Sequence, residues 1–237
     1  MSKAKCTAIV LAAGQGKRMN SEVPKLYIEL QNKPVIYYTL RAFQESACIG
    51  RVVLVVESGQ VERVKTELVK HYGFSKVTDI IEGGKERYDS VWCGLQHVQE
   101  DSYVFIHDGA RAFVTEEIIK RAYENVIKYK ACVVGMPVKD TIKIADKDSI
   151  VSDTPNRSQM WQVQTPQAFE VSLIVEAYRE FMDNSCKIEM NNVTDDSMLV
   201  ERLGKCKVKL VEGSYNNIKI TTAEDIALAE AILKKMY

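Results

Sequence analysis

Short apolar runs alternate with amphipathic segments along the first part of the chain. The apolar runs lie at 7–11, 51–56, 77–81, 103–107 and 131–136, and helical spacing of apolar residues occurs at 34–43, 60–71, 86–98 and 115–128. Continuous apolar runs are typical of strands buried on both faces. Their regular alternation with helices across short links predicts a doubly wound, mostly parallel sheet of the α/β class. In such sheets ligands bind beyond the carboxyl ends of the strands.

The pattern changes after residue 139. Two short alternating segments, 141–145 and 149–152, flank Asp146, Lys147 and Asp148 and predict a hairpin inserted into the α/β scaffold. A hairpin of this size cannot hold a core of its own, so it must lie on the body or embrace a partner. Helical patterns return at 171–182 and 195–203, a strand is expected at 207–211, and a last helix begins near 222. With no repeat or linker, residues 1–237 are expected to form one domain with a β-arm at about 139–157.

The charge balance excludes a general attraction to polyanions. The 237 residues include 32 Lys and Arg and 32 Asp and Glu, which gives a formal net charge of zero. The chain therefore lacks the basic excess of proteins that bind nucleic acid or anionic membranes. No apolar run approaches a membrane span of roughly 18 residues, and the first residues contain no signal-peptide core. We expect a cytoplasmic protein with no nucleic-acid or membrane partner.

The cysteines and histidines form no recognisable metal-binding or disulfide pattern. The six cysteines are widely scattered without a Cys-x-x-Cys pair, and the three histidines are isolated. Several cysteines lie in apolar runs, which is typical of reduced, packed thiols in a cytosolic protein. The expected chemistry must therefore come from other residues.

A loop of small residues and cations follows the first apolar run. Its members are Ala12, Ala13, Gly14 and Gly16, followed by Lys17, Arg18 and Lys25. Such a loop presents backbone N–H groups to a phosphate, and nearby cations neutralise it. The loop is no P-loop, because Arg18 stands where Ser or Thr is needed, and no dinucleotide fingerprint, because Met19 replaces the third glycine. It predicts a polyphosphate site, with an ordinary turn bearing surface cations as the alternative.

Two later loops also follow predicted strands. Gly83 and Gly84 allow a ligand to approach the backbone, and Ser90 can bind a base or sugar, although a simple turn before a helix explains the same residues. Asp108 is well placed for a ribose hydroxyl or phosphate-bound Mg²⁺, and Arg111 for a phosphate; the alternative is that Asp108 only caps a turn. The segments 137–141, 156–157, 161–167 and 217–221 are polar, and each taken alone favours a structural role.

The polar segments occur in an order that spacing alone does not explain. They are Leu11-Ala12-Ala13-Gly14-x-Gly16-x-Arg18-Met19 with Pro24-Lys25, Glu86-Arg87-x-Asp89-Ser90-Val91, His107-Asp108-x-Ala110-Arg111, Pro137-Val138-Lys139-Asp140-Thr141, Trp161-x-x-x-Thr165-Pro166-Gln167 and Asn217-Ile218-Lys219-x-Thr221. The first resembles the signature of nucleotidyltransferases that join a polyol or sugar phosphate to a nucleotide. The ordered set, which spans nearly the whole chain, resembles the 2-C-methyl-D-erythritol 4-phosphate cytidylyltransferase family.

The resemblance implies a Rossmann-like α/β domain with a protruding β-arm, and a homodimer whose arms interlock. It implies an enzyme that takes CTP and 2-C-methyl-D-erythritol 4-phosphate and yields 4-diphosphocytidyl-2-C-methyl-D-erythritol and pyrophosphate. The family needs Mg²⁺ and serves the non-mevalonate isoprenoid pathway. The predicted hairpin between 139 and 157 fits the arm.

The resemblance also assigns site residues position by position. Ala12, Ala13, Gly14, Gly16, Arg18 and Lys25 are expected to hold the CTP triphosphate, Gly83, Gly84 and Ser90 the cytosine, with Arg87 and Gly109 completing the CTP site. Asp108 is expected near the ribose and Mg²⁺. Arg111, Thr141, Arg157, Thr165 and Lys219 are expected to bind the erythritol phosphate, with Thr141 and Arg157 reaching the neighbouring subunit's site. Arg18, Lys25, Arg157 and Lys219 are the expected catalytic cations.

Four positions depart from the usual family pattern. Gly109 and Ala112 replace alanine and proline, Lys85 replaces an acidic residue, and Asn156 replaces aspartate. The first two are expected to loosen the ribose-side loop. The family of ribitol 5-phosphate cytidylyltransferases is the nearest rival, although its first loop usually reads Leu-Ala-Gly-Gly. A sugar-1-phosphate nucleotidyltransferase and a catalytically inactive nucleotide-binding regulator are more distant rivals.

Overall fold

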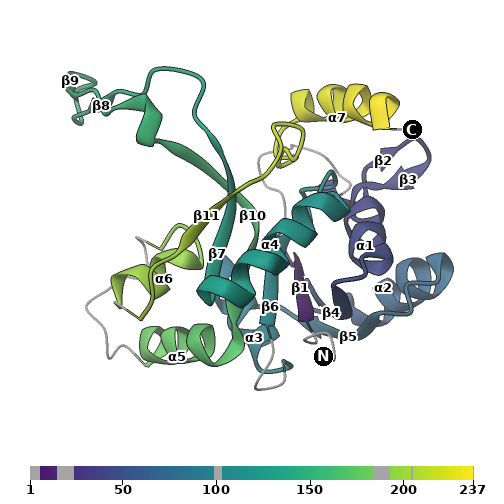
Figure 1. Cartoon of the computed structure of the whole chain (residues 1–237). Coiled ribbons are helices and arrows are strands. Elements are labelled where there is room, and N and C mark those ends of the chain that lie inside the picture. Colours follow the sequence, from purple (N-terminus) through teal and green to yellow (C-terminus); the bar gives the residue numbers. More distant parts are fainter. Residues whose placement is uncertain (1–5, 15–23, 99–102, 184–192, 204, 237) are drawn as a thin grey trace.

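The computed structural model of the chain describes residues 6–14, 24–98, 103–183, 193–203 and 205–236. A seven-stranded sheet has the order β11-β7-β10-β6-β1-β4-β5 (Figure 1). Its strands are β1 (Cys6–Ala12), β4 (Ile49–Val56), β5 (Val77–Glu82), β6 (Tyr103–Asp108), β7 (Ala131–Pro137), β10 (Trp161–Glu170) and β11 (Lys209–Glu212). The α-helices are α1 (Val35–Glu45), α2 (Val61–Val64), α3 (Arg87–Leu95), α4 (Glu116–Tyr129), α5 (Val171–Met182), α6 (Ser197–Arg202) and α7 (Ala223–Met236). Two small sheets pair β2 (Glu29–Leu30) with β3 (Lys33–Pro34), and β8 (Ile144–Ala145) with β9 (Val151–Asp153).

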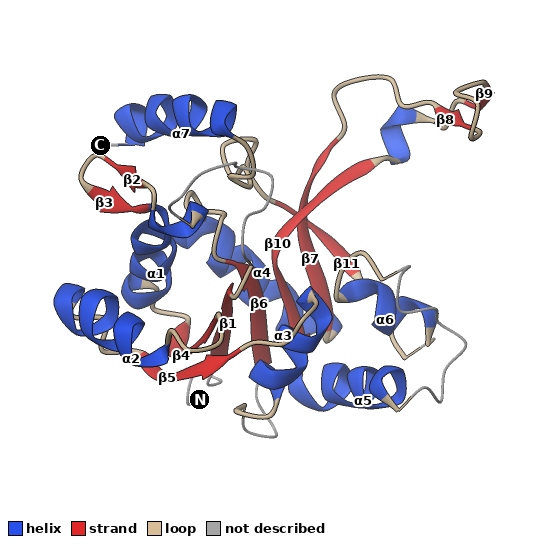
Figure 2. Ribbon diagram, turned by 180° about the vertical axis from the view of Figure 1, so that it is seen from behind, coloured by secondary structure: helices blue, strands red, loops and turns tan. Residues whose placement is uncertain are grey.

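Successive residues of the buried strands pack into different cores on opposite faces of the sheet. In β1, Ala8 and Val10 belong to one core and Ile9 to the other. Helices α1, α2, α4 and α7 cover the first core, and α3, α5 and α6 cover the second (Figure 2). Because side chains alternate across a strand, a strand covered on both faces must be apolar at nearly every position. The unbroken apolar runs of the sequence arise in this way.

The order of the strands reverses at β1. The chain builds from β1 to β4 and β5, and then places β6 on the other side of β1. Strand β1 is parallel to both β4 and β6, with Leu11 opposite Val55 and Asp108. The loops on the two sides of such a reversal diverge and leave a crevice beyond the carboxyl ends of the strands. The loops after β1 and β6 therefore border the expected ligand site.

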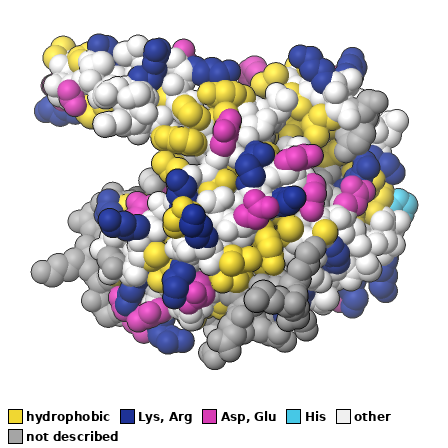
Figure 3. Space-filling model, in the orientation of Figure 1, with side chains coloured by type: hydrophobic (Ala, Val, Ile, Leu, Met, Phe, Trp, Pro, Cys, Tyr) yellow, Lys and Arg dark blue, Asp and Glu magenta, His cyan; other side chains and the backbone are white. Residues whose placement is uncertain are grey.

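A hairpin arm extends from β7 and β10. Both strands run past the sheet toward β8 and β9, whose side chains are exposed, and the arm projects from the body (Figures 1 and 3). The Asp146 carboxylate accepts hydrogen bonds from the backbone N–H groups of Asp148 and Ile150, both at 2.9 Å. The paired part of the hairpin, Ile144–Ala145 with Val151–Asp153, is shorter than the predicted segments 141–145 and 149–152.

The mostly parallel, doubly wound α/β sheet with an inserted hairpin is confirmed, but β10 was not predicted as a strand. It lies antiparallel between β6 and β7. Its pairing with β7 is interrupted between Val163 and Gln167, where Pro166 falls. Polar residues and a proline do not give the apolar alternation of a strand, and proline normally argues against a central one. Gln167 is fully buried, and hydrogen bonds to its side chain offset that burial.

Two local details also differ from the expected pattern. The predicted helix at 60–71 contains α2 followed by a π-helical segment, Lys65–Lys70. The small β2–β3 pair had no signal in the hydrophobic pattern. Within the described ranges, no helix has the length and apolar character needed to cross a membrane.

Candidate active site

A cavity of about 180 Å³ lies beyond the carboxyl ends of β1 and β6. Its walls come from four segments of the chain: the loops after β1, β5 and β6, and the segment before α7. The lining residues are Leu11, Ala13, Gly14, Lys25, Leu26, Gly84, Lys85, Glu86, Arg87, Ser90, Asp108, Gly109, Ala110 and Lys219. We call this the first cavity. Its position at the strand-order reversal is the one expected for a nucleotide.

The loops after β1 and β5 pack closely against each other at Gly83. A Cβ atom at this position would lie 2.6 Å from both the Ala13 Cβ and the Ser90 Oγ, so only glycine fits without a shift. The Ser90 hydroxyl accepts from the Gly84 N–H and donates to the Glu86 carbonyl, both at 3.2 Å. These contacts fix the backbone that the first cavity presents to a ligand.

The loop after β6 is held tightly at Gly109. Its N–H donates to the Leu11 carbonyl at 2.9 Å, and its carbonyl accepts from the Thr39 hydroxyl at 2.8 Å. A Cβ at Gly109 would lie 2.7 Å from that Leu11 oxygen. Gly109 and Ala112 are both buried. The expectation that Gly109 loosens the ribose-side loop is therefore wrong, because glycine here permits the close approach to β1. The same expectation for Ala112 stays a prediction.

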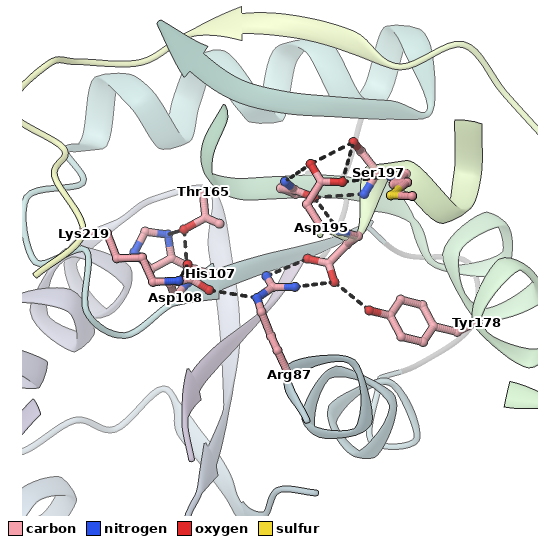
Figure 4. A network of polar contacts seen from close by, with 11 residues as sticks. Arg87, His107, Asp108, Thr165, Tyr178, Asp195, Ser197 and Lys219 are labelled. Carbon is pink, nitrogen blue, oxygen red and sulfur yellow. Dashed lines mark hydrogen bonds and ion pairs between the residues drawn. The ribbon is translucent and has the colours of Figure 1, made fainter. Parts of the chain in front are cut away.

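Asp108 lies between two cations at the edge of the first cavity. Its Oδ1 is 3.1 Å from Arg87 Nε, and its Oδ2 is 2.7 Å from Lys219 Nζ (Figure 4). Burial alone would raise the pKa of the Asp108 carboxyl, but Arg87, Lys219 and Arg111 outweigh it and hold this pKa well below its usual value. Asp108 is therefore ionised at any physiological pH and can hold a cation in place.

His107 and Thr165 secure the backbone at Asp108. The Thr165 hydroxyl accepts from the Asp108 N–H at 3.1 Å and lies 3.1 Å from His107 Nδ1, while His107 Nε2 lies 3.1 Å from the Arg111 carbonyl. Because a carbonyl can only accept, Nε2 carries the proton, and Nδ1 accepts from the Thr165 hydroxyl. This neutral tautomer links the backbone of Asp108 to that of Arg111.

A second cavity, of about 250 Å³, adjoins the first. It is lined by Arg111, Gln162, Val163, Gln164, Tyr215, Ile218 and Lys219. The Arg111 guanidinium donates to the Asn217 carbonyl at 2.8 Å and the Val163 carbonyl at 3.4 Å, but among the described residues its buried Nε has no hydrogen-bond partner. A buried cationic donor without a partner suits an anion that enters this cavity.

Lys219 is the residue that the two cavities share. It lines both, and its ammonium group is held by Asp108 at their junction. About one third of its side chain is exposed, at 35%. A cation in this position can contact two anions that approach from different sides, and thereby offset the repulsion between them.

The structure brings together most of the predicted site residues. Ala13, Gly14, Lys25, Gly84, Arg87, Ser90, Asp108 and Gly109 line the first cavity, Arg111 lines the second, and Lys219 lines both. Gly83 packs against Ala13 and Ser90 of that lining, and Ala12 is buried at the end of β1 and lines neither cavity. Gly16 and Arg18 lie outside the described residues.

Three predicted substrate-binding residues line neither cavity. Thr141 and Arg157 are exposed on the arm and line neither cavity, and Arg157 donates to the Lys139 carbonyl at 3.0 Å. Thr165 is buried, and its hydroxyl contacts the Asp108 N–H and His107 Nδ1.

Asp196 had no signal in the sequence, and Asn217 was marked only as part of the segment 217–221, without its partners. Asp196 binds Arg87 through both carboxylate oxygens at 2.8 Å, although the two are 109 positions apart. Asn217 donates to the Thr165 carbonyl and to Gln164, and thereby joins the segment before α7 to β10. Both residues stand in polar stretches of the sequence, and nothing there identifies their partners.

The small number of carboxylates at the first cavity limits how a metal ion can bind there. Among the described residues, no group of three His, Cys, Asp or Glu side chains could hold a metal ion. Two carboxylates, Glu86 and Asp108, line the first cavity, and Asp108 is the one that contacts the Lys219 ammonium. Mg²⁺ commonly uses one or two carboxylates and takes its remaining ligands from substrate phosphates and water. The donor set therefore fits a metal that arrives with a triphosphate, and does not fit a resident all-protein site.

We expect His107 to make folding sensitive to mild acid. Its burial lowers the pKa of the imidazole to about 4, whereas an unfolded histidine binds a proton near pH 6.5. The unfolded chain thus binds more protons in this window, and the free energy of unfolding falls as pH drops from about 6.5 to 4, by about 3 kcal/mol in total. Denaturant titrations from pH 7 to 4.5 should show a shallower fall for His107→Gln. His71→Gln, at an exposed position, is the matched control; equal slopes for wild type and His107→Gln would contradict the assignment.

The sequence and the fold both have close relatives among known proteins. Residues 6–235 match the family described as 2-C-methyl-D-erythritol 4-phosphate cytidylyltransferase. The chain is 51% identical over 228 residues to the protein of that name from Lachnospira eligens, covering 96% of this chain and 99% of the relative. It is 48% identical over 231 residues to the one from Lachnoclostridium phytofermentans, covering 98% and 97%. The crystal structure of 4-diphosphocytidyl-2C-methyl-D-erythritol synthase from Anaerococcus prevotii aligns with a TM-score of 0.85 at 35% identity, over 98% of this chain and 97% of that chain.

Proposed function

The chain belongs to the 2-C-methyl-D-erythritol 4-phosphate cytidylyltransferase family, and we propose that it joins its two substrates across the pair of cavities that meet at Lys219. It is a nucleotidyltransferase of isoprenoid precursor synthesis that transfers CMP from CTP to 2-C-methyl-D-erythritol 4-phosphate and releases pyrophosphate. In this proposal CTP occupies the first cavity, and the phosphate of the acceptor occupies the second. The observation that carries it is the position of Lys219, which lines both.

The reaction follows from the charges of the two substrates. The acceptor phosphate is already an oxyanion at neutral pH, so it needs no general base. One of its oxygens attacks the α-phosphorus of CTP, and the bond from that phosphorus to the bridging oxygen breaks, so that pyrophosphate leaves with the electron pair. The protein must hold two polyanions in line and offset the charge that builds on the α-phosphate oxygens. Among the described residues that line the cavities, none is a histidine or cysteine, and lysine and arginine predominate among the charged side chains.

Each cation has a distinct place in the proposal. Lys25 and Arg87 face the first cavity and would meet the CTP side, together with Arg18. Arg111 would hold the acceptor phosphate, and Lys219 would bridge acceptor and α-phosphate. Asp108 would take a Mg²⁺ ion that arrives with the triphosphate. That ion would neutralise phosphate charge and orient the departing pyrophosphate.

We further propose a cytoplasmic homodimer of one-domain chains (residues 1–237), in which the arm of one protomer embraces the other. The apolar residues Ile144, Ile150 and Val151 support this, because they are exposed on the arm, which projects from the body (Figure 1). Arg157 and Thr141 have no role in their own cavities and would complete the site of the partner. Sedimentation velocity should give a dimer; a fully active monomer would contradict this part of the proposal.

Pyrophosphate release tests the choice of acceptor. Purified protein is mixed with CTP and Mg²⁺, and with 2-C-methyl-D-erythritol 4-phosphate, ribitol 5-phosphate or no acceptor. We expect rapid release only with the first acceptor, and chelation of the metal should abolish it. Turnover with ribitol 5-phosphate alone would favour the ribitol 5-phosphate cytidylyltransferase family. Release without any acceptor would contradict direct transfer.

A further inference from the structure

The Arg87 guanidinium lies between two carboxylates, one at the first cavity and one fully buried. Its terminal nitrogens bind the two oxygens of Asp196 at 2.8 Å each, and its Nε contacts Asp108 Oδ1 at 3.1 Å (Figure 4). The Asp108 carboxylate faces the first cavity, whereas the Asp196 side chain is fully buried, with 0% exposed. The guanidinium thus connects the cavity wall to a carboxylate that no ligand can reach.

Asp196 is itself held firmly. The Tyr178 hydroxyl donates to its Oδ1 at 2.6 Å, and the backbone N–H groups of Asp196 and Ser197 donate to Gln167 Oε1 at 3.1 and 3.0 Å. Gln167 lies on β10 and donates in turn to Asp195 at 3.0 Å. These bonds attach the residues before α6 to the central sheet, so the carboxylate has a fixed position relative to the end of β6.

The geometry divides the donors of Arg87 between its two partners. Asp196 receives one N–H from each terminal nitrogen, and Asp108 receives the N–H of Nε. Asp108 therefore receives one bond from Arg87, and its second oxygen is left for Lys219 at 2.7 Å. The fork of an arginine pairs readily with both oxygens of one carboxylate. If Asp196 lost its charge, the fork of Arg87 could turn to Asp108 and compete with Lys219 for Oδ2.

We propose that Asp196 is a positioning residue for the transfer reaction: it fixes the Arg87 guanidinium so that Asp108 remains available to hold Lys219 at the junction of the two cavities. The inference rests on the proposed role of Lys219. Asp196 touches no substrate, and its effect runs through Arg87 and Asp108. Each of these charged groups contacts the next, from Asp196 through Arg87 and Asp108 to Lys219. Substitutions at these positions should therefore have strongly coupled effects on the rate.

A double-mutant cycle with Lys219 tests the proposal. Asp196→Asn keeps the size of the side chain and removes its charge. We expect the single-turnover rate to fall at least about tenfold, because a small displacement of a transition-state cation has an effect of this order. In a Lys219→Met background the same substitution should change the rate less than about threefold, because the group that it positions is gone. An equal loss in both backgrounds would make Asp196 merely structural and overturn the proposal.

Two further variants keep the test decisive. Asp79→Asn removes the carboxylate of the Arg51–Asp79 pair (2.7 Å), which lies outside both cavities, and should leave the rate unchanged. If Asp196→Asn does not fold, Tyr178→Phe replaces it, because it removes the hydrogen bond to Asp196 Oδ1 at 2.6 Å and Tyr178 lines neither cavity. This variant should likewise lose rate only when Lys219 is present; loss in both backgrounds would overturn the inference. A wild-type protein inactive with CTP and the methylerythritol acceptor would instead refute the proposed function.

Discussion

Replacing Lys219 by methionine should lower the rate of a single turnover by about 100-fold or more, equivalent to about 3 kcal/mol of transition-state stabilisation. Lys219 is the one described cation that lines both cavities, and Asp108 holds its ammonium group at their junction. When the acceptor oxygen approaches the α-phosphorus, negative charge accumulates at this point. A neutral side chain of similar length would leave that charge without compensation. Rapid-quench measurements with saturating substrates would give the rate of the chemical step.

A lysine with the same kind of carboxylate partners provides the control for Lys219. Lys205 contacts Glu176 at 2.9 Å and Glu180 at 2.6 Å, away from both cavities. Lys205→Met should therefore leave the single-turnover rate within about twofold, because solvated ion pairs contribute little. If Lys219→Met changed only the KM values and left the rate of the chemical step near normal, Lys219 would bind substrate without stabilising the transition state.

The second large effect is expected for Arg111→Lys, which should raise the KM for the acceptor about 10- to 100-fold while CTP affinity changes less than threefold. Arg111 reaches the second cavity with a buried Nε that has no partner among the described residues, and it does not line the first cavity. Lysine keeps the charge but loses the planar fork that binds phosphate through two nitrogens, a charge-assisted contact of roughly 1.5–3 kcal/mol. Initial rates at saturating CTP would give the KM, and calorimetry would give CTP affinity.

Arg121 offers a closely matched control for Arg111. Its guanidinium also donates to two backbone carbonyls, those of Glu212 at 3.0 Å and Gly213 at 3.3 Å, but it lines neither cavity. Arg121→Lys removes the same kind of backbone support without touching a proposed ligand. If both variants raised the acceptor KM equally, the effect of Arg111 would come from loop packing, and its proposed contact with the acceptor would be refuted.

The sheet was predictable because its physical cause is visible in the sequence. Strands such as β1 and β4 are covered by helices on both faces, so nearly every position is apolar and the run is unbroken. The place of the first cavity followed from the same fact, because parallel strands bring their carboxyl ends to one edge. Strand β10 was missed for the converse reason. Its buried Gln164 and Gln167 are compensated by hydrogen bonds to distant segments, and no local pattern reports such bonds.

Some residues of the candidate site could likewise be predicted from the sequence, and others could not. Residues at the end of a strand or just after it, such as Asp108 and Arg111, could be selected from position and chemistry. Their partners could not: Arg87 and Asp196 meet only because α6 packs beside α5 against the sheet. The role expected of Thr165 shows the same limit. Its hydroxyl faces His107 and Asp108, which the spacing of the residues does not reveal.

The stereochemical course at the α-phosphorus tests the central claim most directly. If the acceptor phosphate in the second cavity attacks CTP in the first, the reaction is a single in-line displacement. A single diastereomer of CTP that carries sulfur on the α-phosphate should then give product with inverted configuration at phosphorus, as judged by ³¹P NMR after conversion to a reference compound. Retention of configuration would require two displacements through a covalent intermediate on the protein, and would contradict direct transfer between the two cavities.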